Sequence, residues 1–171
     1  MRYRFLWGCG LFAFAVAVTP AQTKLSTSGK CNKPEVQQSV PAGDQEGHVF
    51  MLGQGKCVTE GKVAGASSKE GAFSEHAEAT GNHLKTWGVY VETFDSGDKI
   101  HYNYQGTATM KDGKLQSGLD KWQITGGTGK MKGLKGSGTC KLSPGTNEGG
   151  LDYSCTGTYM QGGAAPAAKP Q

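Results

Sequence analysis

The chain has 171 residues, of which 36% are hydrophobic and 19% charged, and 18 Lys and Arg against 14 Asp and Glu give a formal net charge of +4. Arg2 and Arg4 lie in a predicted leader, so the rest carries 16 basic and 14 acidic residues, a net charge of +2. The lysines of segment 124–159 are interleaved with glycines and lack stacking aromatics, unlike a nucleic-acid site. The sequence therefore predicts no nucleic-acid partner.

Residues 1–21 have the three parts of a secretory signal peptide. Arg2 and Arg4 supply the positive charge, residues 11–18 form the apolar run, and small residues precede the predicted cleavage site after Ala21. A membrane anchor needs about 18 to 20 apolar residues, and this run is shorter. We therefore expect cleavage near Ala21, a secreted or periplasmic location, and no integral membrane span in the mature chain.

The remaining chain divides by composition into three parts. Segment 22–45 is polar, contains Pro34 and Pro41 and shows neither helical nor strand periodicity, so we expect a polar linker there. Residues 161–171 have low complexity, which predicts a disordered tail. Between them, residues 46–160 are long enough for one domain with one core.

Within 46–160, short β-prone runs alternate with turn signals at the spacing typical of an all-β barrel or sandwich. The predicted strands are His48–Thr59, Ala72–Ala79, Leu84–Phe94, Lys99–Met110, Leu115–Thr125, Lys135–Leu142 and Leu151–Tyr159. Tight hairpins are predicted at 95–98 and 111–114, where Asp and Gly favour short turns. The expected fold class is all-β, a single antiparallel β-barrel of about seven or eight strands.

The hairpin at 95–98 suggests a catalytic pair. With its two aspartates facing each other, Glu92 lies opposite His101 and close to Tyr90 and Asn103. A carboxylate and an imidazole that face a cavity could act as acid and base, so Glu92 and His101 are the candidate catalytic residues. The alternative is a Glu–His pair on the solvated surface, which contributes under about 1 kcal/mol.

A second polar group is formed by Ser74, His76 and Glu78, which point the same way on a predicted strand. If this face lined the barrel interior, the histidine and the carboxylate could transfer protons. The alternative, a solvated outer face, is favoured because ionisable residues are seldom buried and an antiparallel sheet commonly has one wet face.

Four cysteines remain after cleavage, and an even number in an exported chain predicts two disulfides. Sequence alone leaves three connectivities open. An antiparallel hairpin that places Cys140 opposite Cys155 also pairs Thr with Thr and Gly with Gly on either side, which are compatible neighbours. This register favours Cys140–Cys155, and by elimination Cys31 pairs with Cys57.

Motifs for cofactors are absent from the sequence. A phosphate loop would need a glycine at Ile124 and a serine or threonine at Met131. A dinucleotide fingerprint that starts at Gly127 meets Lys132 where it needs its third glycine. No close pair of cysteines or histidines supports a metal site. We therefore expect neither a cofactor nor a metal.

The segment 122–139, WQITGGTGKMKGLKGSGT, resembles the signature hairpin of the allene oxide cyclase and dirigent superfamily of β-barrels. In that family a strand runs into a Gly-Gly-Thr-Gly turn, a bend with an apolar residue follows, and Gly-x-Gly opens the next strand. The residues that fit are Trp122, Gly126, Gly127, Thr128, Gly129, Met131, Gly133, Leu134, Gly136 and Gly138. The run 97–107 also looks like secreted bacterial relatives of unknown function, so the resemblance covers roughly 72–159.

The resemblance implies several functions, because the family includes cyclisation of an unsaturated epoxide, steering of phenolic radical coupling, and bacterial members without an established activity. We expect a non-enzymatic barrel that binds a small apolar or aromatic molecule or has a structural role in the envelope. The alternative is a cofactor-free isomerase or cyclase of the allene oxide cyclase or dirigent type. Family members often associate through barrel faces, so a homo-oligomer stays open.

Aromatic residues of the predicted barrel are the candidates for ligand binding, because a barrel of about eight strands can hold one small ligand. The predicted ligand-binding residues are Tyr90, Tyr102, Trp87 and Trp122. Tyr90 and His101 are expected to orient the ligand.

Overall fold

The structure is a computed structural model that describes residues 21–146 and 149–162. The predicted signal peptide, apart from Ala21, and the predicted tail from residue 163 onward lie outside the described residues. The described elements are β1 Thr23–Cys31, β2 Val36–Pro41, β3 His48–Glu60, β4 Lys62–Val63, β5 Ala66–Thr80, β6 His83–Phe94, β7 Lys99–Lys111, β8 Lys114–Gly127, the 3-10 helix η1 Gly129–Met131, β9 Leu134–Pro144 and β10 Leu151–Gln161. In this part of the chain no helix is long and apolar enough to cross a membrane.

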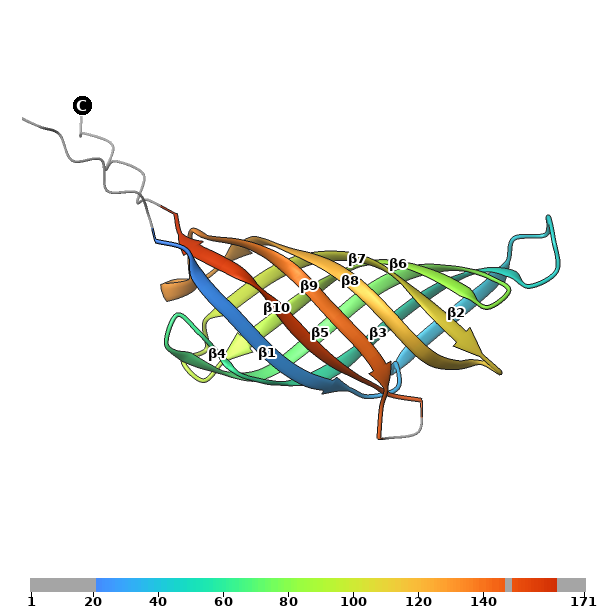
Figure 1. Cartoon of the computed structure of the whole chain (residues 1–171), viewed down its shortest axis with the longest axis horizontal. Coiled ribbons are helices and arrows are strands. Elements are labelled where there is room, and N and C mark those ends of the chain that lie inside the picture. Colours follow the sequence, from blue (N-terminus) through green and yellow to red (C-terminus); the bar gives the residue numbers. More distant parts are fainter. Residues whose placement is uncertain (1–20, 147–148, 163–171) are drawn as a thin grey trace, which may run out of the picture.

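Eight of these strands close into an antiparallel barrel, as Figure 1 shows, which confirms the predicted fold class. The order around the barrel is β3, β1, β10, β9, β8, β7, β6 and β5, and the pairing of β5 with β3 closes it. Two short strands are additions: β2 pairs beside β3, and β4 pairs beside β5. Closure leaves no free edge along most of the sheet.

The segment predicted to be a linker instead contributes β1 and β2. β1 pairs with β10 along its whole length and with β3 through residues 28–31, so it closes the barrel. The strand pattern was hard to detect because Leu25 is its one large apolar side chain that points inward. Another inward position of β1 is Gly29, which the ring of Tyr153 on β10 covers. The barrel therefore begins at β1 and not at residue 46.

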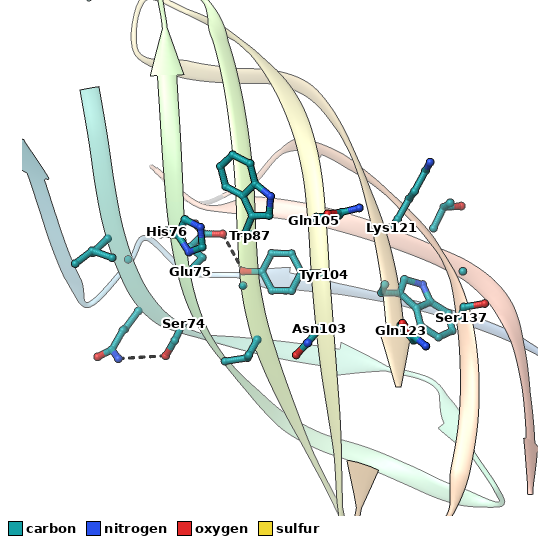
Figure 2. A pocket seen from close by; sticks show the side chains of 18 of the residues that line it. Ser74, Glu75, His76, Trp87, Asn103, Tyr104, Gln105, Lys121, Gln123 and Ser137 are labelled. Atoms are coloured by element: carbon teal, nitrogen blue, oxygen red, sulfur yellow. Dashed lines mark hydrogen bonds between the residues drawn. The ribbon is translucent and has the colours of Figure 1, made fainter. Parts of the chain in front are cut away.

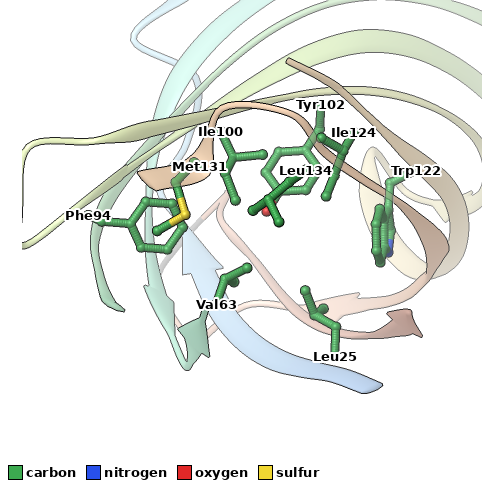
Figure 3. Packing of buried hydrophobic residues seen from close by; sticks show 9 residues of the cluster. All are labelled: Leu25, Val63, Phe94, Ile100, Tyr102, Trp122, Ile124, Met131 and Leu134. Atoms are coloured by element: carbon green, nitrogen blue, oxygen red, sulfur yellow. The ribbon is translucent and has the colours of Figure 1, made fainter. Parts of the chain in front are cut away.

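One end of the barrel is filled by an apolar core, shown in Figure 3. Its buried members are Leu25, Val63, Phe94, Ile100, Tyr102, Trp122, Ile124, Met131 and Leu134. Met131 comes from η1 and Val63 from β4, so both short elements cover this end (Figure 1). Burial of each large apolar side chain stabilises the fold by about 1.5–3 kcal/mol.

Inward-facing glycines accommodate the large rings of neighbouring strands. The ring of Tyr104 on β7 lies against Gly88 on β6, and the ring of Tyr90 on β6 lies against Gly71 on β5. Trp122 lies against Gly138 on β9 in the same way. The glycines that the sequence concentrates in these strands are therefore sites of close approach, where an added Cβ would overlap a ring.

We expect Gly88→Ala to lower the free energy of unfolding by about 1–3 kcal/mol, the usual cost of overpacking. The added methyl group would overlap Tyr104 and displace its hydroxyl from Glu75. The matched control is Gly53→Ala, because this glycine also faces inward but its nearest neighbour, Cγ of Glu75, would lie 3.6 Å from the new Cβ. Urea denaturation of both variants measures the difference, and equal losses would contradict the ring-against-glycine packing.

Two disulfides cross-link neighbouring strands, Cys31–Cys57 between β1 and β3 and Cys140–Cys155 between β9 and β10. These are the two pairs that the sequence analysis favoured. In both cases the two cysteines are directly opposite each other in the register of their strands.

Candidate functional site

Two carboxyl groups inside the barrel accept hydrogen bonds from tyrosines. Tyr102 donates to Oε2 of Glu92 over 2.7 Å, and Tyr104 donates to Oε2 of Glu75 over 2.8 Å. The two tyrosines are two residues apart on β7, so both point to the same side of the sheet. Glu92 is only 3% exposed. The polar groups of these pairs therefore face the interior.

Asp120 on β8 is a third carboxyl group of the interior. It lies opposite Gly106 on β7, and a side chain at that glycine would overlap the carboxyl group of Asp120. Burial raises the pKa of Asp120 to about 6, and the negative charge of Glu75 also raises this pKa. Burial likewise raises the pKa of Glu75 and of Glu92, against the smaller, opposite effect of the tyrosine hydrogen bonds.

The interior acids have no cationic partner of the usual kind. Each lysine of the described chain is exposed, and His76 and His101 are exposed as well. A buried carboxylate without a cation is costly, so the protonated form gains in relative stability. The interior is therefore suited to neutral hydroxylated, phenolic or cationic groups and unsuited to anions.

Next to Glu92, three hydroxyl groups form a closed set of contacts. Oγ1 of Thr59 lies 2.7 Å from the hydroxyl of Tyr90 and 2.6 Å from that of Tyr153, and the two tyrosine oxygens are 3.3 Å apart. Burial raises the pKa of both tyrosines. The hydroxyls therefore stay protonated, and each can both donate and accept a hydrogen bond.

Four buried polar atoms lack a hydrogen-bond partner among the described residues: Oγ of Ser68, Oε1 of Glu92, Oδ1 of Asp120 and Nε1 of Trp122. The Ser68 hydroxyl is near enough to Glu92 to lower the pKa of that carboxyl group, and Thr86 acts on Asp120 in the same way, although burial has the larger effect on both. Trp122 meets the ring of Tyr102 edge to face, with the centroids 5.7 Å apart, and Tyr102 is bonded to Glu92. An unpartnered donor and an unpartnered acceptor thus belong to side chains that both contact Tyr102. Buried polar groups in proteins are nearly always paired, so these atoms call for a further partner.

The predicted pairing of Glu92 with His101 is wrong by one residue. Glu92 lies opposite Ile100, and His101 lies opposite Val91. The hairpin has a three-residue loop, 95–97, in which Gly97 has a φ of 83°, and the N–H of Phe94 bonds to the carbonyl of Asp98 over 2.9 Å. A shift of one residue moves a side chain to the other face of a sheet. Glu92 therefore points into the barrel while His101 is exposed on its outside.

The four predicted ligand-binding residues do not form one site. Tyr90, Tyr102 and Trp122 lie on the inner face, where the rings of Tyr90 and Tyr102 are 6.1 Å apart. Trp87 points outward and stacks on His76, with centroids 5.1 Å apart and the rings inclined by 10°. The predicted wet face of Ser74 and His76 is likewise on the outside, where it forms part of the groove described below.

Sequence reasoning missed Glu75, Asp120 and Tyr153 as interior polar residues, whereas Tyr104 was expected among the core aromatic residues. A signal for Asp120 was present, because it is two residues before Trp122, which was expected to face inward. A signal for Glu75 was also present, because it lies between Ser74 and His76, which were predicted to be on the wet outer face, and alternate residues of a strand point to opposite faces.

The outer surface carries a groove of about 1190 Å³, shown in Figure 2, which we call the outer groove. Outward side chains of successive strands form its two walls. One wall contains His76, Trp87, Gln105 and Lys121, and the other contains Ser74, Val89, Asn103 and Gln123. Among the described residues no group of three or more His, Cys, Asp or Glu side chains could hold a metal ion.

No protein-family model matches the chain, and no curated protein matches it. Among solved structures, a pterocarpan synthase dirigent protein is similar over 92% of this chain and 95% of its own, with a TM-score of 0.48 and 12% sequence identity.

Proposed function

We propose that the barrel interior binds a small aromatic molecule that carries a hydroxyl or amine group, without changing it chemically. The observation that carries this proposal is the set of buried atoms that lack partners, Oε1 of Glu92 and Nε1 of Trp122, beside the ring of Tyr102. A ligand that donates to the carboxyl group and accepts from the indole would satisfy both atoms. The tyrosine and tryptophan rings would supply the apolar contacts.

We propose further that the protein works outside the cytoplasm. Disulfides form and persist in oxidising compartments, and the two cross-strand disulfides fit a secreted or periplasmic protein. The predicted signal peptide points the same way.

The test is native mass spectrometry of the protein purified, without reductant, from its own producing cells. We expect an additional mass from a bound small molecule. The matched variant is Trp122→Phe, which keeps a large ring but removes the N–H donor. We expect it to weaken binding about tenfold, the effect of losing one buried hydrogen bond of about 1.4 kcal/mol, and so to lower the fraction of loaded protein. Protein that carries no ligand, and that no phenol or aromatic amine stabilises against heat, would contradict the proposal.

A second candidate function is cofactor-free isomerisation or cyclisation, and one observation favours it. Burial raises the pKa of Glu92, and a carboxyl group that keeps its proton closer to neutral pH is a better general acid. Glu92→Gln separates the two functions, because the amide keeps the shape of the side chain but cannot transfer the proton. If the variant binds the ligand and neither it nor the wild type converts the ligand, the protein only binds. If the variant binds the ligand but loses a conversion that the wild type carries out, Glu92 takes part in catalysis.

A further inference from the structure

We propose that the outer groove is a second binding site, and that it takes an extended chain of neutral sugars. The proposal rests on the outward side chains of the two walls. Glu75, Tyr104 and Trp122 lie between the walls and also belong to the lining, but their side chains point inward, and the tests below change outward side chains alone. Three properties of the groove carry it: its shape, its hydrogen-bonding groups and its charge.

The shape of the groove follows from strand register. His76 pairs with Trp87, Trp87 with Gln105, and Gln105 with Lys121, so one wall runs directly across the strands. The other wall is parallel to it, two residues further along each strand, which separates the walls by about 7 Å.

The groove reaches from β2 to β9 and crosses seven strands, which at about 4.8 Å between strands gives a path of roughly 29 Å along the curved outer surface of the barrel. So long and narrow a groove fits a chain rather than a single compact molecule.

The walls carry hydrogen-bonding groups that are free to meet a ligand. The side-chain amides of Asn103, Gln105 and Gln123 have no hydrogen-bond partner within the described part of the chain. Ser74 accepts a hydrogen bond from Gln54 over 3.1 Å, which orders that end of the groove (Figure 2). An amide presents donors and acceptors together, and so does each hydroxyl group of a sugar, so a row of amides matches a row of hydroxyls.

Near the middle of the groove lies an aromatic platform. Trp87 is half-buried and stacks on His76 with a ring inclination of 10°, which fixes the orientation of the indole. Sugar rings combine polar edges with an apolar C–H face, and an ordered indole offers an apolar surface for that face. An aromatic ring with amides beside it therefore matches both parts of a sugar.

The charge of the groove excludes other polymers. Lys121 is the only lysine in the described lining, and the carboxyl group of Glu75 turns inward to Tyr104. Nucleic acid or an anionic polysaccharide would need several cations, and a cationic partner would need outward acids. The other outward lysines of β6 to β9, including Lys85 and Lys141, lie outside the lining, so the groove is a band of low charge, with Lys121 as its one lysine, on a more highly charged surface.

Affinity electrophoresis in native gels tests the proposal, with the gels cast with β-glucan, xylan, glucomannan or dextran and, for comparison, with anionic alginate. We expect at least one of the neutral polymers to retard the protein and alginate to give no retardation. Trp87→Ala should weaken the retardation about tenfold. The matched control is Leu119→Ala, because Leu119 is an exposed apolar residue of β8 that lies outside the groove.

A double variant, Gln105→Ala with Gln123→Ala, removes amides from both walls and leaves the aromatic platform in place, so it tests the site even if Trp87→Ala unfolds. We expect it to weaken retardation by the same neutral polymer, with an unchanged melting temperature. No retardation in any neutral gel would overturn the proposal, as would retardation that neither variant weakens. Concentration-dependent sedimentation that Trp87→Ala abolishes would assign the groove to a second copy of the chain instead.

Discussion

Exchanging Cys31→Ser and Cys57→Ser together lowers the free energy of unfolding by about 3.5 kcal/mol, the loop-closure value for the 26-residue separation of these cysteines. The structure adds a local reason for a large effect. β1 is paired with β3 through only four residues, Ser28 to Cys31, and this short seam closes the barrel on that side. Without the disulfide, β1 can separate from β3 while it stays paired with β10.

Denaturation in guanidinium chloride measures the loss, and hydrogen exchange shows where it acts. We expect faster exchange in β1 and the second half of β3. The matched control is the double exchange Cys140→Ser and Cys155→Ser. It removes a disulfide between residues 15 apart and should lower the free energy of unfolding by about 3 kcal/mol. There the two strands pair through eleven residues on each side, so exchange in β9 and β10 should change little. A loss below 1 kcal/mol at the Cys31–Cys57 seam would contradict its role in closing the barrel.

The sequence predicts the later part of the barrel better than its beginning, for a physical reason. From His48 onward, the strands are rich in β-branched and aromatic residues and are separated by Asp and Gly turns, as at Asp112-Gly113, where both φ angles are positive. In β1 the inward positions need no large side chains, because a ring from β10 fills the space over Gly29. Alternation of apolar and polar residues, the usual signal, is therefore weak there.

The candidate site was predicted only in part, because inner and outer faces depend on turn length. The alternation of residues along β6 puts Trp87 on one face of the strand and Tyr90 and Glu92 on the other, but it does not indicate which face points into the barrel. The loop between β6 and β7 has three residues where the sequence predicted two. His101 and its neighbours on β7 are therefore shifted by one position against β6, and each points to the face opposite to the predicted one. Disulfide partners were easier to predict, since Cys140 and Cys155 are held in register by compatible residues on both sides. Strand register is thus more predictable where compatible residues flank the pair on both sides, as around Cys140 and Cys155, than where it depends on the assumed length of a turn, as at Glu92 and His101.

We expect the barrel to become more stable as the pH falls from 7 to about 4, the reverse of ordinary acid denaturation. Burial raises the pKa of Asp120 from 3.8 to about 6, so the folded state keeps this proton over a pH range in which the unfolded chain has lost it. A folded state that binds more protons loses stability as the pH rises. Glu75 and Glu92, whose pKa values are also raised by burial, act in the same direction.

Asp120→Asn should raise the free energy of unfolding at pH 7 by about 2 kcal/mol, since a full shift of this size corresponds to about 3 kcal/mol before partial exposure is allowed for. The variant should also lose most of the dependence on pH between 4 and 6. Removal of the charge at Asp120 relieves Glu75 as well, because the two carboxylates repel each other. The pH dependence of stability that remains in this variant therefore comes mainly from the titration of Glu92.

Urea denaturation at intervals of pH between 4.0 and 6.5 measures this slope. Asp112→Asn is the matched control, because this aspartate is exposed in a turn and its exchange removes the same charge from the chain. The slope is compared below about pH 5.5, where His48 stays protonated in both the folded and the unfolded chain, since its ordinary pKa is 6.5 and its hydrogen bond to Asp44 raises it. A wild-type stability that climbs steadily from pH 4 to 6.5, or an equal effect of both variants, would show that the interior acids are solvated. Their unpartnered oxygens would then be bonded to water and would not support a ligand site.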